Sequence, residues 1–166
     1  MDAARSVRWL WLTVVVAAAD RASKFAIERL TPEGFIQPLL PGFANLVHSR
    51  NTGIAFGLLS ESASHWVSLL LIASSAIVVI LLAWMLAAGR AGDQSAQPGL
   101  ALIAGGAAGN LIDRLLHGGV TDFLELHAGT FSWPAFNVAD SAITIGALLV
   151  IYELLRGTRH AAGQSA

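Results

Sequence analysis

The 166-residue sequence contains no cysteine. This excludes a disulfide framework, a thiolate nucleophile and cysteine-ligated zinc or iron–sulfur sites. Charged residues make up only 13% of the chain, whereas soluble domains have about 25%. The net charge of −1 provides no basic surface for nucleic acid. The five histidines do not follow HExxH or a similar ligand spacing, so we expect neither a metal site nor a cofactor.

Hydrophobic residues, by contrast, make up 55% of the chain and form four apolar segments, which indicate an integral membrane protein. The clearest segment, Trp66 to Ala88, carries no charge and is long enough to cross a hydrocarbon core of about 30 Å as a helix. We expect one mainly α membrane domain over residues 1–166. Its four predicted transmembrane helices cover about residues 7–28, 66–88, 98–117 and 137–156.

The first segment has two interpretations. Its basic start, apolar run and Ala17-Ala18-Ala19 are similar to a secretory signal with a small-residue cleavage site. If the helix instead continues, it must include Asp20, Arg21 and Lys24. Asp20 and Lys24 are then one turn apart and are a possible ion pair. We therefore interpret the segment as a retained helix.

The distribution of basic residues favours a cytoplasmic N-terminus. An even number of crossings places both termini on one side of the membrane, and cytoplasmic loops carry an excess of Lys and Arg. The side with the termini holds Arg5, Arg8, Arg90, Arg156 and Arg159, and the other side holds Arg21, Lys24, Arg29, Arg50 and Arg114. The region around Asp122 and Asp140 then lies on the extracytoplasmic side.

A small sheet is predicted between the first two helices. Residues Phe43 to Ser49 alternate in a strand-like pattern, and Arg50 to Gly53 provide a turn. Residues Ile54 to Gly57 then return as a second strand.

Two aspartates stand at the boundaries of apolar segments, where ionisable groups are costly and often functional. Asp122 follows Gly118-Gly119, and Asp140 begins the last segment. Two carboxylates brought together there cannot easily both ionise. One can then act as the base that activates water while the other, still protonated, acts as the acid. The alternatives are a surface-loop role for Asp122 and a capping role for Asp140. Asn137 is a suitable N-cap residue three positions before Asp140.

A second polar group ends the third segment. Asp113 and Arg114 are neighbours that can neutralise each other at the helix end. Asn110 lies deeper, and a buried amide needs partners, so we expect it to brace Asp122 or Asp140. The preceding small residues, Gly105 to Gly109, allow close approach of neighbouring helices.

Five sequence blocks, in order along a chain with four apolar segments, resemble the bacterial lipoprotein signal peptidases, also called signal peptidase II or prolipoprotein signal peptidases. Each block alone is weak evidence for the resemblance, but five blocks in the same order are specific to this family. The blocks are Asp20 to Lys24, Arg50 to Gly57, Gly105 to Arg114, Val120 to Phe123 and Phe136 to Ser141.

The resemblance implies an intramembrane aspartyl protease whose catalytic pair is Asp122 and Asp140. Such enzymes remove the signal peptide of prolipoproteins that carry a diacylglyceryl group, and they cut just before the lipid-modified cysteine. The cyclic peptide globomycin is the expected inhibitor. The resemblance also implies an extracytoplasmic β-cradle at about residues 33–60 in the bacterial inner membrane. Substrate contact or support of the dyad is implied for Asn51, Asn110, Arg114 and Asn137, and structural support for Asp20, Lys24 and Asp113.

These residues suggest a hypothesis for the mechanism, in which ionised Asp140 deprotonates water and protonated Asp122 polarises the scissile carbonyl. Two hypotheses from other classes are a proton-coupled carrier, with the aspartates as a relay, and a non-enzymatic assembly factor in which Asp140 is only a cap. Ser23 beside Lys24, and Ser141, are weaker nucleophile candidates.

Overall fold

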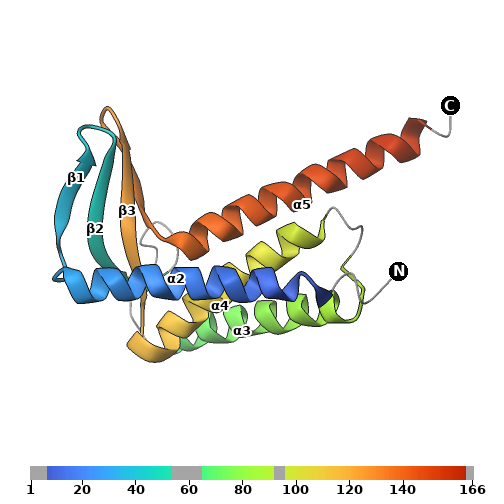
Figure 1. Ribbon diagram of the computed structural model, residues 1–166, viewed down its shortest axis with the longest axis horizontal. Coiled ribbons are helices and arrows are strands. Elements are labelled where there is room, and N and C mark those ends of the chain that lie inside the picture. Colours follow the sequence, from blue (N-terminus) through green and yellow to red (C-terminus); the bar gives the residue numbers. More distant parts are fainter. Residues whose placement is uncertain (1–6, 54–64, 92–95, 164–166) are drawn as a thin grey trace.

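The computed structural model describes residues 7–53, 65–91 and 96–163. It contains four long helices and a four-stranded antiparallel sheet at one end of them (Figure 1). The helices are α2 (Leu10–Leu30), α3 (His65–Ala87), α4 (Gln97–His117) and α5 (Val138–Gly163). The strands are β1 (Ile36–Leu40), β2 (Ala44–Asn51), β3 (Val120–Ala128) and β4 (Phe131–Phe136).

Helix α4 is the centre of the helical part, because it packs extensively against each of the other three helices. Its glycines allow this close approach. A Cβ at Gly105 would lie 2.7 Å from the Cβ of Val16 on α2, and a Cβ at Gly106 would lie 2.8 Å from a side-chain carbon of Ile143 on α5. Packing at small residues, which the sequence predicted, therefore brings α2 and α5 against neighbouring faces of α4.

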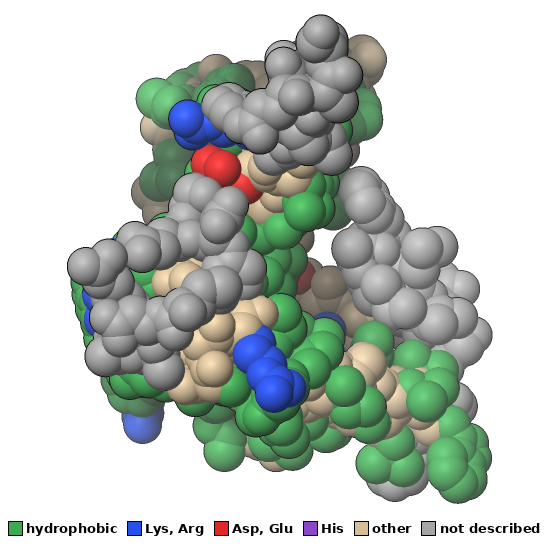
Figure 2. All heavy atoms as spheres, turned by 90° about the vertical axis from the view of Figure 1, so that its right-hand side faces the viewer, with side chains coloured by type: hydrophobic (Ala, Val, Ile, Leu, Met, Phe, Trp, Pro, Cys, Tyr) green, Lys and Arg blue, Asp and Glu red, His purple; other side chains and the backbone are tan. Residues whose placement is uncertain are grey.

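Three described helices are long and apolar enough to cross a membrane: Trp66–Ala87, Gln97–His117 and Val138–Arg156. Helix α2 also has sufficient length but carries several charges. Asp20 and Lys24 are both fully buried, whereas Val14, Val15 and Phe25 are exposed. The outward side of α2 is therefore apolar where it would meet lipid. Apolar side chains also cover most of the described surface seen from the far end of the helices (Figure 2).

The sheet has the strand order β1-β2-β3-β4, and it is larger than predicted. Along the chain, β1 and β2 come between α2 and α3, whereas β3 and β4 come between α4 and α5. The sequence placed the start of the turn too early, at Arg50. In the structure β2 continues through Asn51 and pairs with β3 up to that residue. The second strand expected at Ile54 to Gly57 lies outside the described residues.

A left-handed glycine connects α4 to the sheet. Gly118 has a φ of 72° and its N–H donates to the carbonyl oxygen of Arg114, 3.0 Å away. Glycine adopts this conformation without the Cβ clash that other residues incur. The chain then enters β3 within two residues, and Asp122 opposes Ser49 of β2. This turn places Asp122 beside the end of α4.

The first residue of α2 and the last turn of α5 lie at the end of the helices away from the sheet (Figure 1). This arrangement agrees with an even number of crossings. Helix α5 extends to Gly163 and is longer than the expected 137–156.

Candidate active site

Asp122 is held by two side-chain amides. It is the third residue of β3 and is 3% exposed. The Nδ2 of Asn137 donates to Asp122 Oδ1 at 2.7 Å, and the Nδ2 of Asn51 donates to Oδ2 at 3.2 Å. The surface-loop interpretation of Asp122 is therefore wrong, since pairing of β3 with β2 buries its side chain beside Asn51.

Asp140 lies in the first turn of α5 and takes part in the predicted capping box. Asn137 Oδ1 accepts the backbone N–H of Asp140 at 2.9 Å, and Asp140 Oδ2 accepts the backbone N–H of Asn137 at 3.3 Å. The other carboxylate oxygen, Oδ1, accepts Nδ2 of Asn110 from α4 at 2.9 Å. Asp140 is thus both a helix cap and a carboxylate held by a second helix.

Asn137 connects the two carboxylates. It is 1% exposed, with its oxygen on the backbone of Asp140 and its NH₂ group on Asp122. An amide has one acceptor end and one donor end. Because the acceptor end is used by the start of α5, the donor end must face Asp122.

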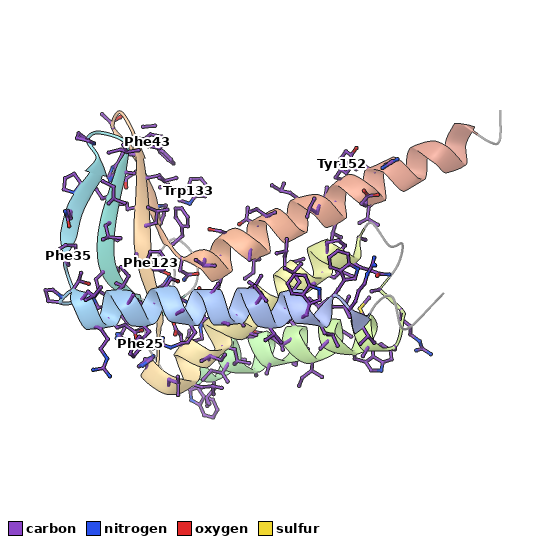
Figure 3. The ribbon with its side chains drawn as sticks, viewed as in Figure 1. Phe25, Phe35, Phe43, Phe123, Trp133 and Tyr152 are labelled. Atoms are coloured by element: carbon purple, nitrogen blue, oxygen red, sulfur yellow. The ribbon has the colours of Figure 1, made fainter. Side chains whose placement is uncertain are left out.

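Both aspartates line one cavity of about 570 Å³, which we call the dyad cavity. Asn51, Asn110 and Arg114 line it as well, as do the residues Trp133 to Phe136 of β4. Trp133 stands on the side of the sheet that faces the start of α5 (Figure 3). Arg50 lines it too, so the cavity combines two carboxylates and two guanidinium groups with an apolar wall.

The electrostatics of the dyad cavity favour one shared proton. Burial, and then the negative charge of Asp140, raise the pKa of Asp122 to about 7. Its hydrogen bonds from Asn51 and Asn137 act in the opposite direction but do not cancel these effects. Near neutral pH, Asp122 is therefore able to carry a proton beside a second carboxylate.

A family model described as Signal peptidase (SPase) II matches residues 12–156 of this chain. A lipoprotein signal peptidase from Solibacter usitatus is 41% identical over 161 residues, which cover 96% of this chain and 98% of that protein. Another from Burkholderia cenocepacia is 45% identical over 154 residues, or 92% of this chain and 90% of that protein. The chain belongs to the signal peptidase II family.

Two solved structures, each described as a bacterial membrane enzyme, have the same fold. One has a TM-score of 0.79 at 32% identity and covers 91% of this chain and 89% of its own. The other has a TM-score of 0.77 at 29% identity, with coverages of 89% and 92%. They confirm the predicted helical membrane fold with a small sheet. Membership of the signal peptidase II family also decides against the carrier and the assembly factor.

Next to the dyad cavity, and joined to it by the hydrogen bond from Lys24 to Asn110, lies a group of paired charges, which we call the ion-pair cluster. Its members are Asp20, Arg21, Lys24, Glu28 and Asp113. The predicted pair of Asp20 and Lys24 is confirmed, with 2.7 Å between Oδ2 and Nζ. Asp20 Oδ1 also accepts the N–H of Ala139 at 2.8 Å, which ties α2 to the start of α5.

The expected neutralisation of Asp113 by Arg114 is wrong. Asp113 pairs instead with Arg21 at 2.9 Å and Lys24 at 3.1 Å. Consecutive residues of a helix point about 100° apart. Asp113 therefore faces α2, whereas Arg114 lines the dyad cavity and donates to the carbonyl oxygen of Asn110 at 3.4 Å.

Sequence reasoning missed two members of this network. Glu28 binds Arg21 at 2.6 Å, and Thr121 donates from Oγ1 to Glu28 at 2.9 Å. The spacing of Arg21 and Glu28 was an available signal, because residues seven apart lie on one helix face. Nothing in the sequence indicated Thr121, whose backbone N–H binds Asp113 through the turn at the end of α4.

The two serine candidates are engaged by their own helices. Ser23 Oγ donates to the carbonyl oxygen of Asp20 at 2.8 Å, and Ser141 Oγ donates to that of Asn137 at 2.9 Å. Such bonds satisfy a helical hydroxyl locally. Neither contact joins a serine to a base, so the dyad cavity remains the best-supported site.

One group in the described residues has metal-ligand geometry: the ligand atoms of Glu28, Asp113 and His117 lie within 4.8 Å of one another. Arg21 forms ion pairs with both carboxylates of this group. A cation already bound between them disfavours a metal ion there. The group is better explained as part of the ion-pair cluster.

Proposed function

We propose that the chain removes signal peptides from lipoprotein precursors, with Asp122 and Asp140 as the catalytic pair. The observation that carries this proposal is the dyad cavity, in which two carboxylates from separate elements are both bound by Asn137. Its side-chain NH₂ donates to Asp122, and its backbone N–H donates to the carboxylate of Asp140. Aspartic peptidases need such a pair, because one carboxylate acts as base while the other acts as acid.

The proposed chemistry begins with ionised Asp140. Its carboxylate accepts a proton from water as the water oxygen attacks the scissile carbonyl carbon, and Asp122 donates its proton to the carbonyl oxygen. When the C–N bond breaks, Asp140 returns its proton to the leaving amine and Asp122 regains one from a hydroxyl of the intermediate. The start of α5 supports an ionised Asp140, since a helix N-terminus favours negative charge.

The proposed substrate is a precursor with a diacylglyceryl group on its cysteine, cut just before that cysteine. An apolar signal segment can reach the site from the membrane, and its acyl chains can remain there. The surroundings support this route. The dyad cavity is lined in part by Phe136 and Ile143, and α5 continues from it with exposed Ile145 and Leu148.

This activity is tested with purified protein and a synthetic lipidated precursor. We expect one cut before the modified cysteine, identified by mass spectrometry, and inhibition by globomycin. The same precursor without its lipid should be cut at least tenfold more slowly. Equal rates would remove the lipid from the recognition model. Failure to cut either precursor would overturn the proposed activity itself.

We further propose that the protein lies in the bacterial inner membrane with both termini in the cytoplasm and the dyad on the extracytoplasmic side. Two basic residues counted on the sheet side have buried partners: Lys24 is enclosed by carboxylates, and Arg21 is paired twice. Their removal from the count strengthens the positive-inside bias toward cytoplasmic termini.

The absence of cysteine makes this orientation directly testable. Ser132 is exposed on β4 and Arg90 is exposed at the opposite end of the helices. In intact cells lacking an outer membrane, an impermeant thiol reagent should label Ser132→Cys but not Arg90→Cys. The reverse labelling pattern would refute the proposed orientation.

A further inference from the structure

Lys24 reaches from the ion-pair cluster toward the dyad. It is 0% exposed, and three oxygens lie within about 3 Å of its Nζ. These are Asp20 Oδ2 at 2.7 Å, Asp113 Oδ2 at 3.1 Å and Asn110 Oδ1 at 2.9 Å. An ammonium group has three protons and cannot accept a hydrogen bond. Lys24 thus forms ion pairs with Asp20 and Asp113 and donates one hydrogen bond to Asn110.

This contact fixes the orientation of the Asn110 amide. Lys24 can only donate, so the oxygen of the amide must face Nζ. The NH₂ end is then directed at Asp140, with 2.9 Å between Nδ2 and Oδ1. The other donor to the Asn110 oxygen is Asn137 Nδ2, at the longer distance of 3.4 Å. Without Lys24, a rotated amide would present its oxygen to the carboxylate and repel it.

Asn137 provides an internal comparison. Its amide also supplies an N–H to the dyad, but its orientation is set by the backbone N–H of Asp140. No side-chain substitution removes that donor. The oxygen of the Asn110 amide instead accepts from side chains in the described residues, and the shorter of these bonds comes from Lys24 of α2.

We propose that Lys24 is a positioning residue for catalysis: it holds the Asn110 amide so that an N–H faces the carboxylate of Asp140. This inference rests on the proposed function and deepens it. The ion-pair cluster thus contributes to the dyad geometry as well as to folding. Charge at Lys24 is required because a neutral polar side chain could also accept and would leave both amide orientations available.

The test compares two matched variants, Lys24→Met and Arg21→Met. Both replace a cation that pairs with Asp113, but only Lys24 contacts Asn110. Loss of one hydrogen bond to a charged group predicts a decrease in kcat of about tenfold to a hundredfold in Lys24→Met. We expect KM to change less than about twofold. In Arg21→Met, kcat per folded molecule should stay within about twofold of wild type.

The pH–rate profile separates positioning from a merely structural role. In Lys24→Met the ionised dyad has lost an N–H donor, so the acidic limb of the profile should move to higher pH. Asp122, Arg50 and Arg114 also line this cavity and are unchanged in both variants. The profile of Arg21→Met should coincide with that of wild type.

A charge-balanced variant controls for misfolding of Lys24→Met. In Asp20→Asn/Lys24→Met the amide oxygen introduced at position 20 can still accept the N–H of Ala139, and no unpaired charge is added. It should show the same loss of kcat and the same shift of the acidic limb. Unchanged kcat and profile in this variant, or equal losses in Lys24→Met and Arg21→Met, would overturn the positioning role. Lack of cleavage by wild type would instead overturn the proposed function.

Discussion

The ion-pair cluster and the dyad cavity, which meet at α4, use the same residue types for different purposes. In the ion-pair cluster, Asp20 and Asp113 are fully buried and each has a cation within about 3 Å. In the dyad cavity, Asp122 and Asp140 receive amide N–H groups. Paired carboxylates are stable and unreactive, whereas carboxylates held by neutral donors beside a cavity retain the ability to exchange protons.

The largest expected effect concerns Asp122 and Asp140. Asp122→Asn and Asp140→Asn should each lower the cleavage rate by about 10²–10⁴-fold or more, since each removes general acid–base catalysis. Thermal unfolding in detergent should show that both variants remain folded. Substantial turnover in either purified variant would exclude that residue from catalysis.

The same substitution in the ion-pair cluster should act on stability. Asp113→Asn removes one ion-pair partner from Arg21 and one from Lys24. Breaking a buried pair costs on the order of 3 kcal/mol, so we expect a clearly lower Tm. Denaturation of Asp113→Asn and Asp122→Asn side by side checks this contrast. Equal Tm values for the two variants would contradict it.

The pH dependence follows from the proton on Asp122. Burial and the charge of Asp140 raise the pKa of Asp122 from its ordinary 3.8 to about 7, so the acid form is lost above that pH. The cleavage rate should therefore fall as the pH rises through about 7, as measured by initial rates across pH 5 to 9. A rate that rises steadily over this range would argue against a protonated Asp122.

Stability should change with pH in the same direction. The unfolded chain releases the proton of Asp122 near pH 3.8, whereas the folded chain keeps it to about 7. The unfolded state therefore binds fewer protons between these values, and the stability contribution of this group falls as pH rises. Asp122→Asn should lack this component, so its Tm relative to wild type should increase from pH 5 to pH 8.

The smallest expected effect concerns Asn51, whose bond to Asp122 is the longer of the two amide contacts at 3.2 Å. Asn51→Ala should lower kcat by about tenfold, the value of one modest hydrogen bond. Asn137→Ala should cost more, since it removes the 2.7 Å contact and the cap of α5 together. Steady-state kinetics of both variants rank the two donors, and a larger loss at Asn51 would reverse the ranking.

The sequence by itself determined the features that depend on neighbours within one or two turns. The lengths of the apolar runs predicted the helices, and the spacing of Asp20 and Lys24 predicted their ion pair. The spacing of Asn137 and Asp140 predicted the capping box. Helical periodicity encodes these contacts directly, because residues three or four apart lie on one face.

Tertiary structure alone decided which distant groups meet. The pairing of β2 with β3 placed Asn51 beside Asp122, and packing of α2 on α4 placed Lys24 against Asn110. Strand register and helix rotation are set by the whole packed molecule, and a shift of one residue would point each side chain elsewhere. For this reason the sequence identified the aspartates, but only the fold showed what holds them.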